Sequence, residues 1–352
     1  MKSYSKALVG VAVAAILSGA TADAQTQRAV GLAHVEAAKK AAGYDVYELV
    51  DHICSRLLVG ASLPYGRIYP PTTRDPAQWS HEPVKVFDNL YYLGENVLSG
   101  SAPSSWAVTT SEGIILIDTM FEDSMKALIV DGMKKVGLDP ANIKYIILTH
   151  GHSDHINGAK YLQETYKPRV IMGGPDWDVV EGNANFRGPK PTRDISGVDG
   201  QKVTLGDTTI TLYLTPGHTP GTLSLLIPVK DNGQPHLAAL RGGTGMQGSA
   251  QIYNTQASRF RDIVTRARAD VLLSTHPQLD KSDIKLPLVQ KRRPGEPHPY
   301  VVGNNVVRAY MTVATECSAA AVALPEEYQG YLGRGAAPSI PAGGAAPAGR
   351  GQ

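Results

Sequence analysis

The sequence lacks the features on which several common classes of protein depend. Only 2 of its 352 residues are cysteine, which excludes a disulfide-dense mini-fold and any zinc or iron–sulfur site built from four cysteines. The 34 Lys and Arg residues nearly balance the 32 Asp and Glu residues, and a formal net charge of +2 argues against a strong electrostatic nucleic-acid binder. The 42% of hydrophobic residues is too high for a disordered chain. What remains is a globular protein with enough residues for a large core.

Long apolar runs are also absent, apart from a short one near the N-terminus. Two lysines precede an apolar stretch at 7–17, and an Ala-Asp-Ala sequence ends at Ala24, so the segment has the three parts of a secretory signal peptide. The stretch is shorter than the ~20 residues that span a bilayer. We therefore expect residues 1–24 to be cleaved, and the mature protein to be periplasmic or secreted without a stable membrane span. The alternative is an uncleaved anchor.

Composition and periodicity divide the rest of the chain into four parts. Helical spacing followed by proline-rich sequence predicts a helical and loop extension over 25–83. Patterns of strands and helices predict a central domain over 84–285. A further helical pattern predicts a C-terminal extension, 286–332, that packs on this domain. Residues 333–352 are rich in Gly, Ala and Pro and cannot bury enough apolar surface to offset their chain entropy, so a disordered tail is expected.

The central domain alternates between strand-like and helix-like periodicity. Hairpins are expected at 84–93, 106–118 and 203–214, and further strands at 143–148, 169–172, 222–229, 237–240 and 270–274. Helices are expected at 125–136, 156–164 and 258–268, and a last one at 301–322. Many hairpins with amphipathic helices between them predict two sheets covered by helices.

Cys54 and Cys317 lie near opposite ends of the chain, outside the central domain. In an oxidising compartment they could form one disulfide bond between the two extensions. Closing so long a loop would stabilise the fold by ~3–5 kcal/mol in the chain-entropy model. The sequence does not give the distance between the two Cα atoms, on which a disulfide depends. We predict the bridge, and two buried free thiols are the alternative.

One segment, Thr149 to His155, concentrates side chains that bind metals. Its sequence is Thr-His-Gly-His-Ser-Asp-His, and it follows an apolar strand directly. Imidazole is a good ligand for zinc, and a carboxylate oxygen completes a harder site. Because glycine and serine let the chain turn, His150 and His152 can face one centre while Asp154 and His155 face another. Four ligands cannot fill two closed sites, so further ligands must come from elsewhere.

Two single histidines follow later strands in a similar way. His218 lies in the sequence Pro-Gly-His-Thr-Pro-Gly, and His276 lies in Ser-Thr-His-Pro. Prolines near both residues stop the strands, which leaves the histidines at the starts of loops, where binding sites are commonly built. These two residues are the candidates for the missing ligands.

The pattern His-x-His-x-Asp-His, followed by Pro-Gly-His-Thr-Pro-Gly, resembles the metallo-β-lactamase superfamily. The full order of motifs, over about residues 84–280, resembles the third subclass of the class B β-lactamases. The resemblance implies an α+β fold, a four-layer αββα sandwich of two mixed sheets packed face to face with outer helices, so that 84–285 would be a hydrolase domain. It implies two zinc ions per chain, the first held by His150, His152 and His218 and the second by Asp154, His155 and His276.

The same resemblance implies a zinc-dependent hydrolase that acts on a small molecule. A metal-bound hydroxide, oriented by Asp154 as the catalytic residue, would attack the carbonyl carbon of a β-lactam and open its amide bond, because zinc lowers the pKa of water from 15.7 to about 7. The expected function is therefore β-lactamase activity, with antibiotic resistance, in a monomeric protein. The alternatives are hydrolysis of another cyclic amide, lactone or ester at the same centre, and a zinc-binding protein without turnover.

The stretch 237–258 departs from the pattern of many superfamily members. Hydrolases that resemble one another in these motifs usually have a metal-bridging Asp here, whereas this stretch contains no Asp or Glu. Three ligands per metal remain, as in the third subclass. That subclass usually has an Asp-Ser-Leu-Ser-like sequence whose serine helps to position bound water or substrate. Thr244 and Ser249 are the candidates for this substrate-binding role here.

Residues 243–248 match Gly-x-Gly-x-x-Gly, the phosphate-binding pattern of dinucleotide sites. Such a site needs a helix immediately after the glycines, within a βαβ unit. We expect no clear helix to begin within 249–256, so we interpret the segment as an active-site loop and not as a nicotinamide-cofactor site.

Overall fold

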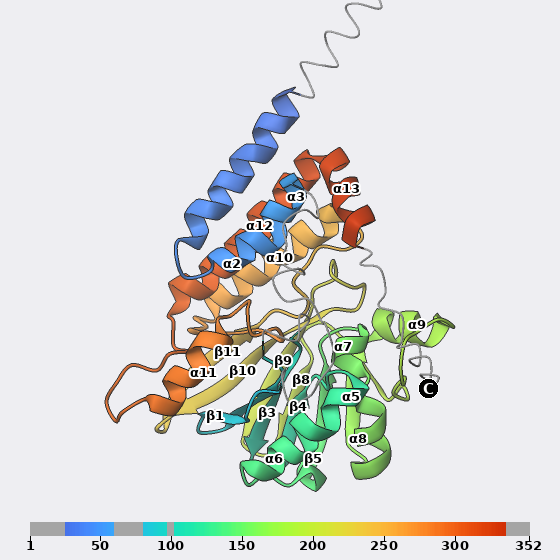
Figure 1. Cartoon of the computed structure of the whole chain (residues 1–352), viewed down its shortest axis with the longest axis vertical. Helices are drawn as coiled ribbons and strands as arrows, with labels where there is room; N and C mark the ends of the chain where they lie inside the picture. Colours follow the sequence, from blue (N-terminus) through green and yellow to red (C-terminus); the bar gives the residue numbers. More distant parts are fainter. Residues whose placement is uncertain (1–24, 60–79, 97–101, 336–352) are drawn as a thin grey trace, which may run out of the picture.

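The computed structural model describes residues 25–59, 80–96 and 102–335, and Figure 1 shows their arrangement. The predicted signal peptide at 1–24, most of the predicted proline-rich loop and the chain from 336 onward lie outside the described residues. Among the described helices, none combines the length and the apolar character that a membrane crossing requires.

Seven strands form the first sheet, in the order β1 to β7. Strands β1 to β4 pair antiparallel, whereas β4 to β7 pair parallel, so the sheet is mixed. The strands are β1 (Val84–Phe87), β2 (Leu90–Gly94), β3 (Ser104–Thr110), β4 (Gly113–Ile117), β5 (Ile143–Leu148), β6 (Arg169–Gly173) and β7 (Ile195–Gly197). The predicted hairpins at 84–93 and 106–118 and the predicted strand at 143–148 are confirmed.

Five strands form the second sheet, in the order β12-β11-β10-β9-β8. All neighbours pair antiparallel except β11 and β12. The strands are β8 (Lys202–Leu205), β9 (Thr208–Leu214), β10 (Leu223–Asp231), β11 (Gln234–Leu240) and β12 (Val271–Leu273). Apolar side chains of both sheets, including Trp106, Ile147, Leu225 and Leu273, form one buried cluster between them. The α+β sandwich of two mixed sheets is therefore confirmed.

Helices with one apolar face cover the outer face of the first sheet. α5 (Glu122–Met125), the π turn η5 (Lys126–Val130) and α6 (Asp131–Lys135) run on as one helix, and η6 (Pro140–Asn142), α7 (Ser153–Ile156), α8 (Ala159–Tyr166) and α9 (Gly174–Gly182) follow. Met133 and Trp177 share a buried cluster with Ile146 of the sheet. The predicted helix at 156–164 is divided at Gly158, where a Cβ would lie 2.3 Å from the carbonyl oxygen of Thr119.

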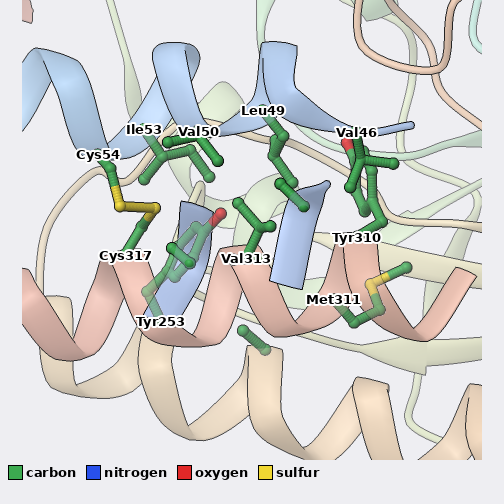
Figure 2. Packing of buried hydrophobic residues seen from close by; sticks show 14 of the residues in the cluster. Val46, Leu49, Val50, Ile53, Cys54, Tyr253, Tyr310, Met311, Val313 and Cys317 are labelled. Atoms are coloured by element: carbon green, nitrogen blue, oxygen red, sulfur yellow. A yellow bond between two sulfur atoms is a disulfide. The ribbon is translucent and has the colours of Figure 1, made fainter. Parts of the chain in front are cut away.

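The two extensions and α10 cover the outer face of the second sheet (Figure 1). This layer contains a helix at 25–42, then α2 (Tyr47–Val50), η1 (Asp51–Ser55), α3 (Arg56–Val59), α10 (Ala250–Arg266), α12 (Asn304–Ala323) and α13 (Pro325–Gly335). Leu49 and Ile53 lie opposite Val313 (Figure 2), in the buried cluster that also includes Ala239 and Leu272 of the sheet.

A disulfide bond joins the two extensions. Cys54 in η1 is bonded to Cys317 in α12, with their Cα atoms 4.9 Å apart across a sequence separation of 263 residues. Figure 2 shows the bond at the end of the apolar contact between these helices. The predicted bridge is confirmed, and only the packing of the two helices decides the distance on which it depends.

The expectation for the start of α10 was wrong. The helix begins at Ala250, eight residues before the predicted start, because Ser249 caps it and accepts a hydrogen bond from the backbone nitrogen of Ile252. α10 therefore connects the parallel strands β11 and β12 as a βαβ unit. The glycine loop before it nevertheless packs on an imidazole, since a Cβ at Gly243 would lie 2.3 Å from the His218 ring.

Two predicted boundaries fall inside helices. The boundary at 285 lies within α11 (Ser282–Lys291), and Leu286 of this helix packs into the cluster between the sheets. The predicted tail began at 333, whereas α13 continues to Gly335. The C-terminal extension is thus continuous in structure with the domain it covers.

Candidate metal centre

Polar residues follow five strands of the sandwich. Asp118 follows β4, His150 lies just after β5, His218 comes after β9, Arg241 follows β11 and His276 lies just after β12. β4 and β5 are parallel, and so are β11 and β12, so the carboxyl ends of each pair lie at one edge of their sheet. Ligand-binding residues are typically found at such edges.

Hydrogen bonds join the two sheets at this edge. The backbone nitrogen of Leu223 donates to the carbonyl oxygen of Thr149 at 2.7 Å. The indole nitrogen of Trp106, in the first sheet, donates to the carbonyl oxygen of Ser274 at 2.8 Å. The loops after β5 and β12 are therefore each held against a strand of the opposite sheet.

The first donor cluster consists of His150, His152 and His218, whose ligand nitrogens lie within 4.8 Å of one another. His218 Nε2 lies 3.2 Å from His150 Nε2 and 3.1 Å from His152 Nδ1. His218 Nδ1 donates to the carbonyl oxygen of Gly245 at 2.6 Å, so its proton is on Nδ1 and the lone pair of Nε2 points toward the other two rings.

The second donor cluster consists of Asp154, His155 and His276, again within 4.8 Å. Asp154 Oδ2 lies 3.5 Å from His155 Nε2 and 4.0 Å from His276 Nε2. The rings of His150 and His155 have centroids 4.0 Å apart, which places the two clusters side by side. The structure thus brings together all six residues that the sequence singled out as metal ligands.

Asp118 orients one histidine of each cluster. Its Oδ2 accepts a hydrogen bond from His155 Nδ1 at 2.7 Å and another from the hydroxyl of Thr149 at 2.8 Å. The same hydroxyl oxygen lies 3.0 Å from His150 Nδ1 and accepts its proton. Both ring protons are therefore on Nδ1, and both Nε2 atoms keep a lone pair for a metal.

Sequence reasoning missed Asp118 and treated it as the end of a strand. The residue is fully buried and has a φ of +58°, a left-handed conformation that is uncommon outside glycine. Its Oδ1 also accepts a hydrogen bond from the backbone nitrogen of Thr149 at 2.7 Å, which helps to hold the Asp118 side chain in place. The available signal was an acidic residue placed directly after the apolar strand 114–117.

Burial decides the protonation of the first cluster. It lowers the pKa of His150 and His218 well below the usual value for histidine, and it lowers the pKa of His152 as well. These imidazoles are consequently neutral at pH 7, which is the form that binds a metal.

Charge has more influence in the second cluster. Burial favours neutral His155, but the carboxylates of Asp154 and Asp118 outweigh this and raise its pKa. Burial also opposes ionisation of Asp154, yet the neighbouring imidazoles, His155 first, hold the pKa of this carboxyl well below its usual range. The second cluster therefore pairs an anion with a histidine that binds a proton readily.

The donor atoms fit zinc. Three imidazole lone pairs converge in the first cluster, an arrangement that a cation between them would stabilise. In the second, His155 Nε2 is buried and has no hydrogen-bond partner among the described residues, which is costly unless something binds it. Imidazole nitrogens and a carboxylate oxygen, three donors to each cluster, match the ligands of catalytic zinc, which keeps a position open for water.

The two predicted substrate contacts differ in their surroundings. Thr244 is 4% exposed, its side chain hydrogen-bonds with buried Tyr310, and its carbonyl oxygen accepts a hydrogen bond from the hydroxyl of Tyr253. Ser249 is exposed at the start of α10. Ser249 is thus the exposed one of the two, with its Oγ at the helix cap, whereas Thr244 packs inside the loop after β11.

Arg241 holds the same loop, and sequence reasoning gave it no role. The side chain is buried, and its Nη1 donates to the carbonyl oxygen of Gly243 at 2.9 Å and to the hydroxyl of Tyr253 at 2.6 Å. The guanidinium also lies 4.2 Å from the centroid of the Tyr253 ring. These contacts fix the loop that carries Gly245, the partner of His218.

Comparison with known proteins agrees with this centre. The family model described as "Metallo-beta-lactamase superfamily" matches residues 98–231, a range that includes five of the six donors. The chain carries a metallo-beta-lactamase superfamily domain. The match ends before His276, which the structure places in the second cluster.

Solved metallo-β-lactamases share the fold of this chain. BJP-1, a subclass B3 metallo-beta-lactamase of Bradyrhizobium japonicum, is 26% identical, with a TM-score of 0.56 over 73% of this chain and 95% of that one. Native FEZ-1 metallo-beta-lactamase from Legionella gormanii is 22% identical, with a TM-score of 0.57 over 75% of this chain and 100% of that one. The structural neighbours thus include subclass B3 metallo-β-lactamases.

Curated relatives include hydrolases of other kinds. The N-acyl homoserine lactonase AttM of Rhizobium radiobacter is 31% identical over 122 residues, which are 32% of this chain and 45% of that protein. The chain spans roughly half of the length of the curated relatives it matches. Proteins named for different substrates are therefore similar to this chain.

Proposed function

We propose that this protein is a dizinc hydrolase that opens the amide bond of β-lactams. The observation that carries the proposal is the pair of adjacent clusters, each of which offers three donors. His150, His152 and His218 would hold one zinc ion. Asp154, His155 and His276 would hold the other.

The missing carboxylate after β11 favours a β-lactam over other substrates. The segment 237–258 contains no Asp or Glu, and Arg241 and two glycines follow the strand instead. In the described part of the chain, each cluster therefore keeps three donors, as the resemblance to the third β-lactamase subclass implies. The likeness to BJP-1, which extends over 95% of that enzyme, supports the same assignment.

Zinc at these sites would supply a water that ionises near neutral pH and positive charge beside the substrate carbonyl. The chain's own contribution is to orient the reactants. Asp154 is ionised at neutral pH, since its histidine neighbours lower its pKa, and its Oδ2 can accept a hydrogen bond from the attacking water. Asp118, through His155 directly and through Thr149 to His150, holds the ligands that place this water. Ser249 offers an exposed hydroxyl for substrate at the end of the loop.

Hydrolysis of a lactone or of another cyclic amide or ester is the second candidate. The observation that favours it is the 31% identity to AttM, which is named as an N-acyl homoserine lactonase, over 122 residues. The same donors would serve, because the attacked atom is a carbonyl carbon in every case. A zinc-binding protein without turnover is a weaker alternative.

A substrate panel with the purified protein separates these functions. We expect hydrolysis of nitrocefin and of at least one clinical β-lactam, loss of turnover with a chelator, recovery with zinc, and two zinc ions per chain by elemental analysis. Preferential cleavage of homoserine lactones or thioesters would establish the second candidate. Uptake of zinc with no cleavage of any of these compounds would refute a hydrolase.

The proposal includes export and a monomeric state. The Cys54–Cys317 disulfide supports a periplasmic or secreted location, because such bonds persist in oxidising compartments. Mass spectrometry of the mature protein would test cleavage after Ala24, and light scattering would test the monomer.

A further inference from the structure

Asp176 links the loops that carry the first donor cluster. The residue lies in the first turn of α9, just after β6, and its side chain is 1% exposed. Its Oδ2 accepts hydrogen bonds from the backbone nitrogen of Gly151 at 2.8 Å and from the hydroxyl of Thr219 at 2.6 Å. Its Oδ1 accepts a hydrogen bond from the backbone nitrogen of Gly221 at 2.7 Å.

Two of these three donors lie next to the histidines in the sequence. Gly151 lies between His150 and His152, on the loop after β5 of the first sheet. Thr219 follows His218 directly, on the loop between β9 and β10 of the second sheet. One buried carboxylate therefore ties together two loops from different sheets, and each loop supplies ligands to the same cluster.

The backbones beside this link are in direct contact, so the loops have little freedom to shift. A Cβ at Gly173 would lie 1.9 Å from the carbonyl oxygen of Gly221, and a Cβ at Gly221 would lie 2.5 Å from the backbone nitrogen of Asp176. Glycine at both positions lets the end of β6 approach the His218 loop closely enough for the carboxylate to reach both loops.

We propose that Asp176 is a positioning residue that sets the distance between the His150–His152 loop and the His218 loop, and thereby the metal affinity of the first cluster. The inference rests on the proposed dizinc centre. The convergence of three nitrogens within about 3 Å depends on this distance. The carboxylate accepts its three hydrogen bonds from Gly151 and from the His218 loop.

The substitution Asp176→Asn tests this assignment. An asparagine has only one acceptor oxygen, so in either orientation of the amide at least one of the three donors loses its partner. The variant is made in two backgrounds: His276→Ala, which leaves only the first cluster with three donors, and His218→Ala, which leaves only the second. Zinc affinity is measured by competition with a chromogenic chelator.

The expected result is selective. In the His276→Ala background, Asp176→Asn weakens zinc binding by about tenfold or more, the range found when groups behind metal ligands are removed. In the His218→Ala background, it changes affinity by less than about twofold, because its bonds do not reach the second cluster. An equal change in both backgrounds would show a general structural role and overturn the inference, as would no change in either.

Two further variants complete the design. Asp194→Asn is the matched control, since this carboxylate also accepts a backbone nitrogen of β6, that of Val170 at 3.0 Å, but contacts neither ligand loop; it should leave both affinities unchanged. If Asp176→Asn does not fold, Thr219→Val removes the hydroxyl that donates to Asp176 and lies 2.7 Å from Thr222 Oγ1, and it should weaken the first cluster several-fold. An unchanged affinity for Thr219→Val in the His276→Ala background would then overturn the inference.

The wild type distinguishes the two levels of proposal. A wild type that binds no zinc overturns the dizinc centre and this inference with it. A wild type that binds two zinc ions but cleaves no lactam, lactone or ester overturns only the proposed reaction. If the wild type binds two zinc ions but Asp176→Asn weakens both clusters equally or neither, only the role of Asp176 is overturned.

Discussion

The two donor clusters lie side by side and are built in the same way, yet their proton chemistry differs. Each takes two donors from the segment after β5 and one histidine from the second sheet. The first cluster has only imidazoles, and burial keeps them neutral. The second contains Asp154 and a histidine whose pKa two carboxylates raise. The comparison teaches that the groups behind and beside the ligands, and not the motif itself, decide how strongly protons compete with a metal.

Removing one ligand from either cluster should have the largest effect on metal content and turnover. His218→Ala and His276→Ala should each reduce the zinc content from two ions to one and lower turnover by about 10²–10³-fold, the usual cost of losing a charge-stabilising group in an active site. Elemental analysis and steady-state kinetics measure both effects. His236→Ala is the matched control, because this histidine also contacts a carboxylate, Asp270 at 2.6 Å, away from both clusters. Retention of two zinc ions by either ligand variant would contradict the assignment.

Removing the disulfide bond should affect zinc binding at the two clusters equally. Cys54 and Cys317 clamp the helical layer over the second sheet, which supplies one histidine to each cluster. The double variant with serine at both positions should lose about 3–5 kcal/mol of unfolding free energy, as expected for opening a long loop. Guanidinium unfolding measures the loss, and zinc content at 25 °C should stay at two. Selective loss of one metal would show that the helical layer supports one cluster more than the other.

Substitution of Asp118 tests whether one carboxylate orients histidines in both clusters. Asp118→Asn should weaken zinc binding by about 10–100-fold, and more strongly in the second cluster, because the carboxylate contacts His155 directly but reaches His150 only through Thr149. Thr149→Val should affect the first cluster alone, since it interrupts only this relay. Zinc titrations in the His218→Ala and His276→Ala backgrounds separate the two sites. Equal effects of Thr149→Val on both would disprove the relay.

Lowering the pH should weaken zinc binding more in the second cluster than in the first. The raised pKa of His155 means that this ring takes up a proton at a higher pH than an ordinary histidine, and zinc must then displace it. The lowered pKa values of the first cluster's histidines mean that they stay neutral to a lower pH. Between pH 7 and 5, the affinity of the second cluster should therefore fall by about tenfold per pH unit while the first changes little. Zinc titrations of His218→Ala and His276→Ala at three pH values measure this difference. A larger fall in affinity for the first cluster than for the second would contradict the account.

The comparison also shows which parts of the site sequence patterns could predict. Five of the six donors were found because histidines are rare and here follow an apolar strand or lie in a turn sequence, and Asp154 was found because it lies between two of them. The hydrogen-bonding groups behind them were missed. Asp118 and Asp176 are common residue types in ordinary contexts, and their roles depend on contacts across 25 to 45 residues of sequence. A single sequence contains no signal for such contacts.

The start of α10 was missed for a related reason. Residues 249–256 are mostly polar and give a weak helical period, so the glycine loop before them obscured the beginning of the helix. In the folded protein, Ser249 caps the first turn, and Tyr253 packs inward beside Arg241. Tertiary packing thus stabilises a turn of helix that the local pattern alone does not indicate.

Most strands, the class of the fold and the six ligand residues could be predicted from the sequence, because periodicity and residue chemistry are local properties of the chain. Packing of the folded chain set the distance that lets Cys54 bond to Cys317, the burial that sets the histidine pKa values, and the carboxylates that orient the rings. Each of these depends on a distance between segments far apart in the chain, and such a distance is fixed only when the two sheets and their helical layers pack.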